Sequence, residues 1–145
     1  MKTNFMLSMA MAALACASAF AAPPETSVEV LLDTDETVLN QAFAYPEGRA
    51  RITAARITVP PGATVPLHLH PVPLFAYILQ GELIVDYGSR GTRTYRKGDA
   101  FVEAFDWSHS GRNGGRGNVI ILAVYAGAVG TDNSIPESGS EHSLR

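Results

Sequence analysis

The 145-residue chain contains a single cysteine, Cys16, which lies in an N-terminal segment that we expect to be removed. The mature protein would then have no cysteine, which excludes disulfide bonds and thiol chemistry. The formal net charge is −3 at neutral pH, and loss of the positive charge of Lys2 makes it −4. This balance gives a nucleic-acid partner no electrostatic support.

The first residues, Met1–Ala21, have the composition of a secretory signal peptide. Lys2 is followed by a run of apolar and small residues that ends in Ala19-Phe20-Ala21, a small-x-small cleavage site. We expect cleavage after Ala21 or Ala22. An uncleaved membrane anchor is the weaker alternative, because Pro23-Pro24 would break a continuing helix.

A lipid anchor on Cys16 is a second alternative for this segment. It is the weaker interpretation because a lipobox has leucine three residues before the cysteine, where this chain has Ala13. We therefore expect an exported protein, periplasmic or secreted, with no membrane span in its mature form.

After the signal peptide, short β-forming runs alternate with turn signals, and no stretch has the apolar period of a helix. Strands at this spacing predict an all-β sandwich or barrel in one domain, residues 22–130, followed by a loose polar tail, residues 131–145. The expected strands are Val28–Leu32, Thr37–Tyr45, Ala50–Val59, Val65–His70, Leu74–Leu79, Glu82–Tyr87, Thr92–Arg96, Ala100–Ala104 and Asn118–Tyr125.

Three of the four histidines lie in two short stretches, and the fourth, His142, lies in the polar tail. His68 and His70 are one residue apart, so on a strand their side chains project from the same face. Two neutral imidazoles on one face can bind a metal ion together. Such a pair occurs by chance often enough that His109, the third histidine, is needed to support a metal site.

The spacing around these histidines resembles the two motifs of the cupin superfamily. Gly62 is followed after five residues by His68-Leu69-His70 and later by Gly81, as in the first motif. Gly98-Asp99 is followed by His109, and Asn113 stands four residues later, as in the second motif. The resemblance implies a single-domain, jelly-roll-like cupin β-barrel, similar to quercetin dioxygenase, in which His68, His70 and His109 bind a divalent metal.

Two departures from the motifs affect this site. Leu74 stands where the first motif has its metal-binding glutamate, and Ala104 and Asp106 replace the proline and glycine of the second motif. Glu103 is the candidate catalytic residue, either as a hydrogen-bond partner of a metal ligand or general base, or as a fourth metal ligand. Asn113 is interpreted as a turn former.

Further residues have less specific interpretations. A group of glycines between the third histidine and the last expected strand predicts a flexible hairpin, formed around Gly111, Gly114, Gly115 and Gly117. Aromatic residues near the motifs are expected in the core or at the mouth of a pocket: Phe75, Tyr77, Phe101, Phe105 and Trp107.

Three neutral imidazoles leave the charge of a divalent ion uncompensated, so the site should favour anionic ligands. The ligand set resembles the iron sites of thiol dioxygenases. The leading hypothesis is a dioxygenase that uses Fe2+ and acts on an anionic chelating small molecule, with Zn2+, Ni2+, Mn2+ or Cu2+ left open. The alternatives are a non-catalytic protein that binds a metal or small ligand, a metal-dependent isomerase or lyase, and a cupin that has lost its metal.

Cupins often pair through their first strands, so we expect a homodimer that exchanges Val28–Leu32.

Overall fold

The computed structural model describes residues 25–137. The predicted signal peptide, residues 1–21, and His142 lie outside the described residues. Nine strands and one short 3-10 turn, η1 (Gly88–Arg90), make up the fold. The strands are β1 (Ala50–Val59), β2 (Thr64–Leu69), β3 (Leu74–Gln80), β4 (Glu82–Asp86), β5 (Thr92–Arg96), β6 (Ala100–Val102), β7 (His109–Asn113), β8 (Val119–Ala128) and β9 (Ile135–Pro136).

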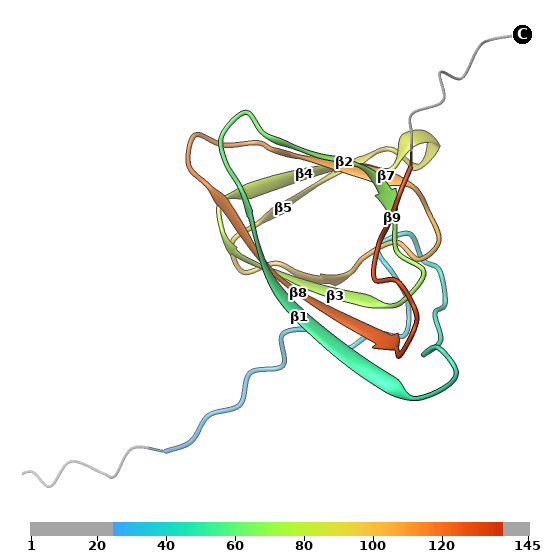
Figure 1. Cartoon of the computed structure of the whole chain (residues 1–145). Coiled ribbons are helices and arrows are strands. Elements are labelled where there is room, and N and C mark those ends of the chain that lie inside the picture. Colours follow the sequence, from blue (N-terminus) through green and yellow to red (C-terminus); the bar gives the residue numbers. More distant parts are fainter. Residues whose placement is uncertain (1–24, 138–145) are drawn as a thin grey trace, which may run out of the picture.

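The strands form two antiparallel sheets that face each other, which confirms the all-β prediction (Figure 1). One sheet has the order β1-β8-β3-β6, and the other has the order β5-β4-β7-β2-β9. The arrangement is the sandwich form of the jelly roll, with two separate sheets rather than one continuous ring of strands.

The core lies between the sheets because alternate residues of each strand point inward. Val119 and Ile121 on β8 and Ile78 on β3 come from one sheet, while Leu83 and Val85 on β4 come from the other. All five are buried in a single hydrophobic cluster. This packing fixes which face of each strand looks into the interior, and therefore where the histidines point.

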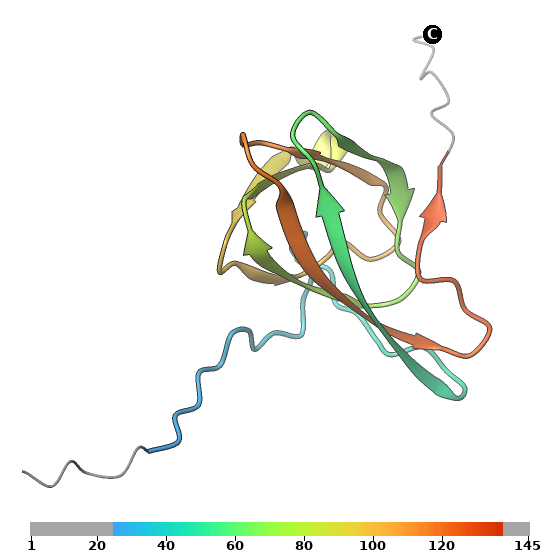
Figure 2. The same ribbon diagram turned by 60° about the vertical axis from the view of Figure 1, so that its left-hand side comes forward.

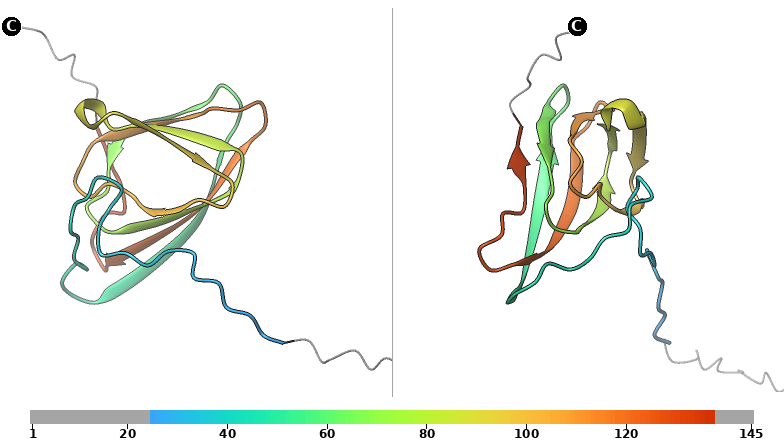
Figure 3. Two further views of the ribbon diagram at one scale, coloured as in Figure 1. Left: turned by 180° about the vertical axis from the view of Figure 1, so that it is seen from behind. Right: turned by 90° about the vertical axis from the view of Figure 1, so that its right-hand side faces the viewer.

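The N-terminal part of the domain differs from the prediction. Val28–Leu32 forms no strand and runs away from the sheets in extended form, as the blue segment in Figure 3 shows. Thr37–Tyr45 forms no strand, and it begins with a turn in which the Asn40 amide donates to the Thr37 carbonyl at 2.9 Å and Asn40 has a positive φ of 56°. A strand needs a neighbour to pair with along its length. Among residues 25–137, Val28–Leu32 lies in no ladder, and Thr37–Tyr45 pairs its backbone with other segments only through an isolated bridge between Ala42 and Glu36 and one bond from the Val38 amide to the Val102 carbonyl oxygen, which the alternation of apolar residues did not show.

Two strands were not predicted. Residues 109–113, which the glycines marked as part of a flexible hairpin, form β7 between β4 and β2. The tail that we expected to be loose from residue 131 contains β9, which pairs with β2 through His68–Pro136 and Leu69–Ile135 (Figure 2). Backbone pairing with a neighbouring strand stabilises both segments, although their composition is poor in β-forming residues.

Gly81, the last glycine of the first motif, forms the turn between β3 and β4. Its φ is +84°, a conformation that favours glycine. A Cβ atom at this position would lie 2.7 Å from the carbonyl oxygen of Asn118, so β8 approaches too closely for a side chain. Within residues 25–137, no helix is long and apolar enough to cross a membrane.

Candidate metal centre

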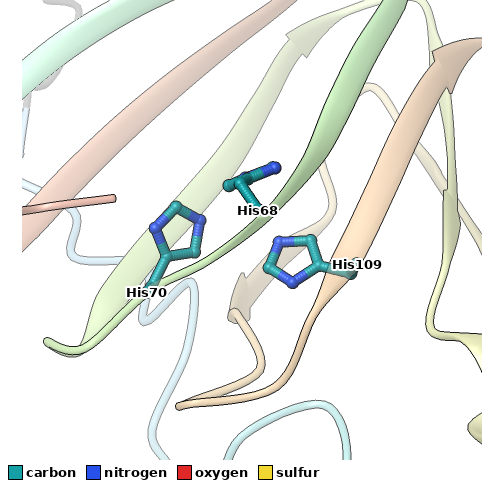
Figure 4. A group of neighbouring side chains, drawn as sticks. All are labelled: His68, His70 and His109. Carbon is teal, nitrogen blue, oxygen red and sulfur yellow. The ribbon is translucent and has the colours of Figure 1, made fainter. Parts of the chain in front are cut away.

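The two sheet strands β2 and β7 bring the three predicted ligands together at one end of the sandwich (Figure 4). His68 and His109 are directly paired residues of the antiparallel strands, so their side chains leave the same face of the sheet. His70 follows the end of β2 and is held beside Phe105 by an isolated bridge. His70 and His109 are buried, and His68 is half-buried.

The three rings face a common point. Their centroids are 4.8 Å apart for His68 and His70, 4.5 Å for His68 and His109, and 5.2 Å for His70 and His109. One ligand nitrogen from each ring lies within 4.8 Å of the others. Two nitrogens bound to one ion at about 2.1 Å are at most about 4.2 Å apart, so small rotations of the rings bring all three into coordination distance.

Hydrogen bonds to the backbone fix the tautomer of each histidine. The Nδ1 atoms lie 2.7 Å from the Pro66 carbonyl oxygen for His68, 2.9 Å from that of Asn133 for His70, and 2.8 Å from that of Trp107 for His109. A carbonyl oxygen only accepts, so each Nδ1 carries the proton and donates. In the neutral rings the lone pair is then on Nε2, which is the arrangement of a metal-binding histidine with an oriented second nitrogen.

Burial keeps two of these rings neutral. Desolvation lowers the pKa of His68, against a smaller opposing effect of its hydrogen bond to Pro66. Desolvation also lowers the pKa of His70 to about 4, with smaller contributions from the neighbouring His68 and His109. Neutral imidazoles are the form that binds a metal, so these two ligands need not lose a proton at neutral pH.

A cavity of about 70 Å³ lies between the sheets next to the histidines. Its walls are mostly aliphatic, and the residues that line it besides the histidines are Ile57, Val65, Leu74, Ala76, Leu83, Val85, Phe101, Glu103, Gly111, Ile121, Ala123 and Tyr125. None of these residues carries a positive charge. The arrangement can therefore place a small molecule against a cation held by the histidines, among mostly aliphatic walls.

Leu74, the first residue of β3, and Glu103, the residue directly after β6, are neighbours. The Glu103 amide donates to the Leu74 carbonyl oxygen at 2.9 Å, and both side chains line the cavity. The Glu103 Oε2 atom lies 3.8 Å from His109 Nε2, beyond hydrogen-bonding distance. Glu103 therefore lies on the metal side of His109 and does not orient its Nδ1, which is bound to Trp107.

Glu103 is itself held by donors on its other oxygen. The Tyr87 hydroxyl and the Ala104 amide donate to Oε1 at 2.7 and 2.8 Å. Because Tyr87 gives its only proton to Glu103, the Tyr95 hydroxyl is the donor in the 3.0 Å bond between the two tyrosines. Burial raises the pKa of Tyr87, and it raises that of Tyr95 to about 12, so both remain neutral donors.

Sequence reasoning missed three tyrosines at this site. Tyr87, Tyr95 and Tyr125 were not among the candidates, although Leu83, Val85 and Tyr87 follow the two-residue period of inward positions. The expected strand Glu82–Tyr87 already contained Tyr87, so the same alternation would have placed its side chain inside. Phe101 lines the cavity as expected, whereas Phe75 lines a separate groove on the outer face of its sheet.

Asn113 is a turn former, as predicted. Its Nδ2 donates to the carbonyl oxygens of Val59 and Gly117 at 2.8 and 2.7 Å, and its Oδ1 accepts from the Gly115 amide at 2.8 Å. These bonds use the side chain to close the hairpin after β7. Asn113 thus stabilises the strand that presents His109 and does not contribute a ligand atom.

Removing β9 together with the residues before it should weaken metal binding, because Asn133, which precedes β9, supplies the carbonyl oxygen that orients His70. We expect a chain ending at Gly130 to bind Zn2+ about 10- to 100-fold more weakly, the usual effect of losing the group that hydrogen-bonds to a metal-binding histidine. Competition with a chromophoric chelator measures the affinity. A chain ending at Glu137 is the matched control and should bind as the full chain does; equal affinity for both truncations would contradict this role of β9.

The lowered pKa of His70 predicts loss of stability in acid for the metal-free protein. The unfolded state takes up a proton near pH 6.5 and the folded state only near pH 4, so stability is full above 6.5 and falls as pH decreases toward 4. His70 alone should remove about 2 kcal/mol between pH 7 and pH 5. Urea unfolding at the two pH values measures this, and a His70→Gln variant should lose correspondingly less. The same loss in both proteins would contradict the assignment.

Comparison with known proteins identifies the architecture. The sequence profile described as a cupin domain, Cupin_2, matches residues 55–125. An oxalate decarboxylase of Lactobacillus farciminis, solved as a formate complex, is 28% identical with a TM-score of 0.52, and the match covers 59% of this chain and 26% of that one. A Bacillus subtilis oxalate decarboxylase studied for its Mn(II) centres is 27% identical with a TM-score of 0.49, covering 59% and 23%. This chain thus aligns with about a quarter of the length of these enzymes, and no curated protein matches it.

Proposed function

Since this chain belongs to the cupin superfamily, we propose that it is a metal-dependent enzyme acting on a small anionic molecule that coordinates the ion. His68, His70 and His109 would hold the divalent cation through their Nε2 atoms. The observation that carries the proposal is the tautomer of these rings. Three backbone carbonyl oxygens accept hydrogen bonds from the three Nδ1 atoms, so the lone pairs are on the Nε2 atoms, which face a common point beside a cavity.

The donor set fits a first-row divalent metal. Imidazole nitrogens suit iron, zinc, copper and nickel, and three of them leave positions free for a substrate. A bound cation would supply Lewis acidity and, if it is iron, a site for dioxygen. The residues of the chain position the rings, exclude water with the aliphatic walls, and place the Glu103 carboxylate beside the coordination site. Glu103 Oε2 is suited to take a proton from a substrate atom bound there, while Tyr87 holds Oε1 in place.

Our first choice of reaction is dioxygenation with Fe2+, in which both atoms of dioxygen enter the organic substrate. The mature protein, loaded anaerobically with iron(II), would be mixed with dioxygen and a flavonol, a thiol or a 1,3-diketone. Uptake of one dioxygen per substrate consumed would support this reaction. No uptake with any of the three substrate classes would contradict it.

A decarboxylase is the second candidate, and the similarity to an oxalate decarboxylase solved with formate favours it. In that reaction a carbon–carbon bond breaks, carbon dioxide leaves, and the electron pair stays on the carbon, which takes a proton that Glu103 can deliver. Release of carbon dioxide from a small carboxylate under strictly anaerobic conditions would distinguish it from dioxygenation. Metal binding with neither activity would identify a non-catalytic binding protein.

The proposal includes export. The sequence of residues 1–21 supports it. N-terminal sequencing of the protein recovered from the periplasm or medium should begin at Ala22 or Pro23. An intact Met1 on protein recovered from the membrane or cytoplasm would contradict export.

We also propose a homodimer in which Val28–Leu32 packs on a second copy. Val28 is 89% exposed and Val30 is 73% exposed, although both are apolar and lie in an extended segment. Light scattering should give twice the monomer mass for the mature chain. The mass should fall to that of a monomer when Val30 and Leu31 are replaced by aspartate, and a monomeric wild type would contradict the proposal.

A further inference from the structure

We infer that the site selects a small anion with a single negative charge, because Glu103 takes the place of the missing motif glutamate and neutralises half of the charge of the ion. The inference rests on the proposed metal site. It goes beyond that proposal by fixing the charge and the size of the ligand.

The first step is the position of Glu103. The first cupin motif places a carboxylate at position 74, and here that residue is leucine. Glu103 directly follows β6 and donates its backbone amide to the Leu74 carbonyl oxygen, and its side chain lines the same cavity. The carboxylate therefore stands beside position 74, just past the end of the neighbouring strand β6, at the same end of the sandwich.

The second step is the direction in which Glu103 points. Two donors occupy Oε1, which leaves Oε2 facing the histidines. Its distance of 3.8 Å from His109 Nε2 is too long for a hydrogen bond, yet it is close to the separation of about 3.0 to 3.5 Å expected for two ligand atoms of one ion. Glu103 Oε2 thus borders the group of three histidines on the His109 side, close enough for its negative charge to act on an ion held there.

The third step is the charge of the remaining wall. Apart from the histidines and Glu103, Tyr125 is the one residue lining the cavity with a polar side-chain atom, and burial raises its pKa, so it stays neutral. A divalent ion and one carboxylate leave a single positive charge. A buried site is most stable when its charges are balanced, so one monoanion completes it and a dianion leaves an uncompensated negative charge.

The fourth step is the size of the ligand. The cavity of about 70 Å³ is roughly half the volume of an apolar cavity that holds benzene. It therefore accepts only a few non-hydrogen atoms beyond those bound to the ion. The aliphatic walls favour an apolar body on that ligand, such as the methyl group of a short hydroxy acid or the enolate of a small diketone.

The test compares two chelators of similar size that differ by one charge. Glycolate and oxalate both form five-membered chelate rings, and they carry one and two negative charges. Affinities of the fully Co2+-loaded protein for each would be measured by calorimetry, with metal content checked by mass spectrometry. In Glu103→Gln the ratio of oxalate to glycolate affinity should rise at least about tenfold, because a negative charge next to the ligand is removed.

Two further variants make the result specific. Glu47→Gln removes an exposed carboxylate and should leave the ratio unchanged. Leu74→Glu restores the motif carboxylate in addition to Glu103, so glycolate binding should weaken at least about tenfold; this variant tests the inference even if Glu103→Gln does not fold. An unchanged ratio in Glu103→Gln with full metal occupancy would overturn the inference and leave the metal site standing. Absence of bound metal in the wild type would overturn both.

Discussion

His70→Ala should reduce the metal content of the purified protein from about one ion per chain to background, a loss of more than about 100-fold in affinity. Two remaining imidazoles cannot replace the third, because each of the three Nε2 atoms is separately aimed by its own backbone carbonyl. His70 is only 3% exposed, and the walls of the cavity beside it are mostly aliphatic. These walls therefore cannot supply a replacement ligand when the imidazole is removed. Mass spectrometry of protein dialysed against Co2+ measures the stoichiometry.

The fourth histidine provides the matched control for this variant. His142 lies outside the described residues and outside both motifs, so His142→Ala should retain the full metal content. If His70→Ala kept its metal while remaining folded by circular dichroism, the three-histidine centre would be wrong. Loss of metal in both variants would point to unspecific binding by imidazole groups.

Ile78→Ala should lower the free energy of unfolding by about 3 kcal/mol, within the usual range of about 2 to 5 kcal/mol for a large-to-small change in a core. Ile78 is fully buried on β3, where it is part of the cluster that joins the two sheets. Its backbone pairs with Ile121 of β8. Neither strand can therefore move into the space left by the shortened side chain without breaking this pairing. Urea unfolding of the metal-free protein at pH 7 measures the change.

The next residue along β3 is the control for that variant. Leu79 is 38% exposed and points away from the core, so Leu79→Ala should cost no more than about 1 kcal/mol. Both variants remove the same number of carbon atoms, which isolates the effect of burial. Equal losses for the two positions would contradict the assignment of the inward face of β3.

The strands with the clearest patterns could be predicted from the sequence. Ala50–Val59 and Thr92–Arg96 have the predicted bounds because turn residues end each run, and Asn118–Tyr125 is shifted by only a few residues in β8. The pairing of His68 and His70 on one face followed from the two-residue period of a strand. His109 was assigned to the same site by its spacing from a motif glycine, and the structure brings it to His68 across two strands.

What could not be predicted depends on contacts between distant segments. The residues 109–113 are strand only because β2 and β4 lie on either side, and β9 is strand only because β2 has a free edge. The bond from His70 to the Asn133 carbonyl joins positions 63 residues apart, and a backbone acceptor leaves no trace in residue identity. The position of Glu103 relative to His109 also required the structure. The sequence spacing fits a fourth metal ligand as well as a hydrogen-bond partner or general base.

The central claim is that three imidazole nitrogens share one cation, and anomalous diffraction at a metal absorption edge tests it most directly. Crystals of the mature protein grown with Co2+ should give one strong peak per chain, within about 2.1 to 2.2 Å of Nε2 of His68, His70 and His109. A peak bonded to Nδ1 atoms, a peak elsewhere on the chain, or no peak at saturating Co2+ would contradict the account.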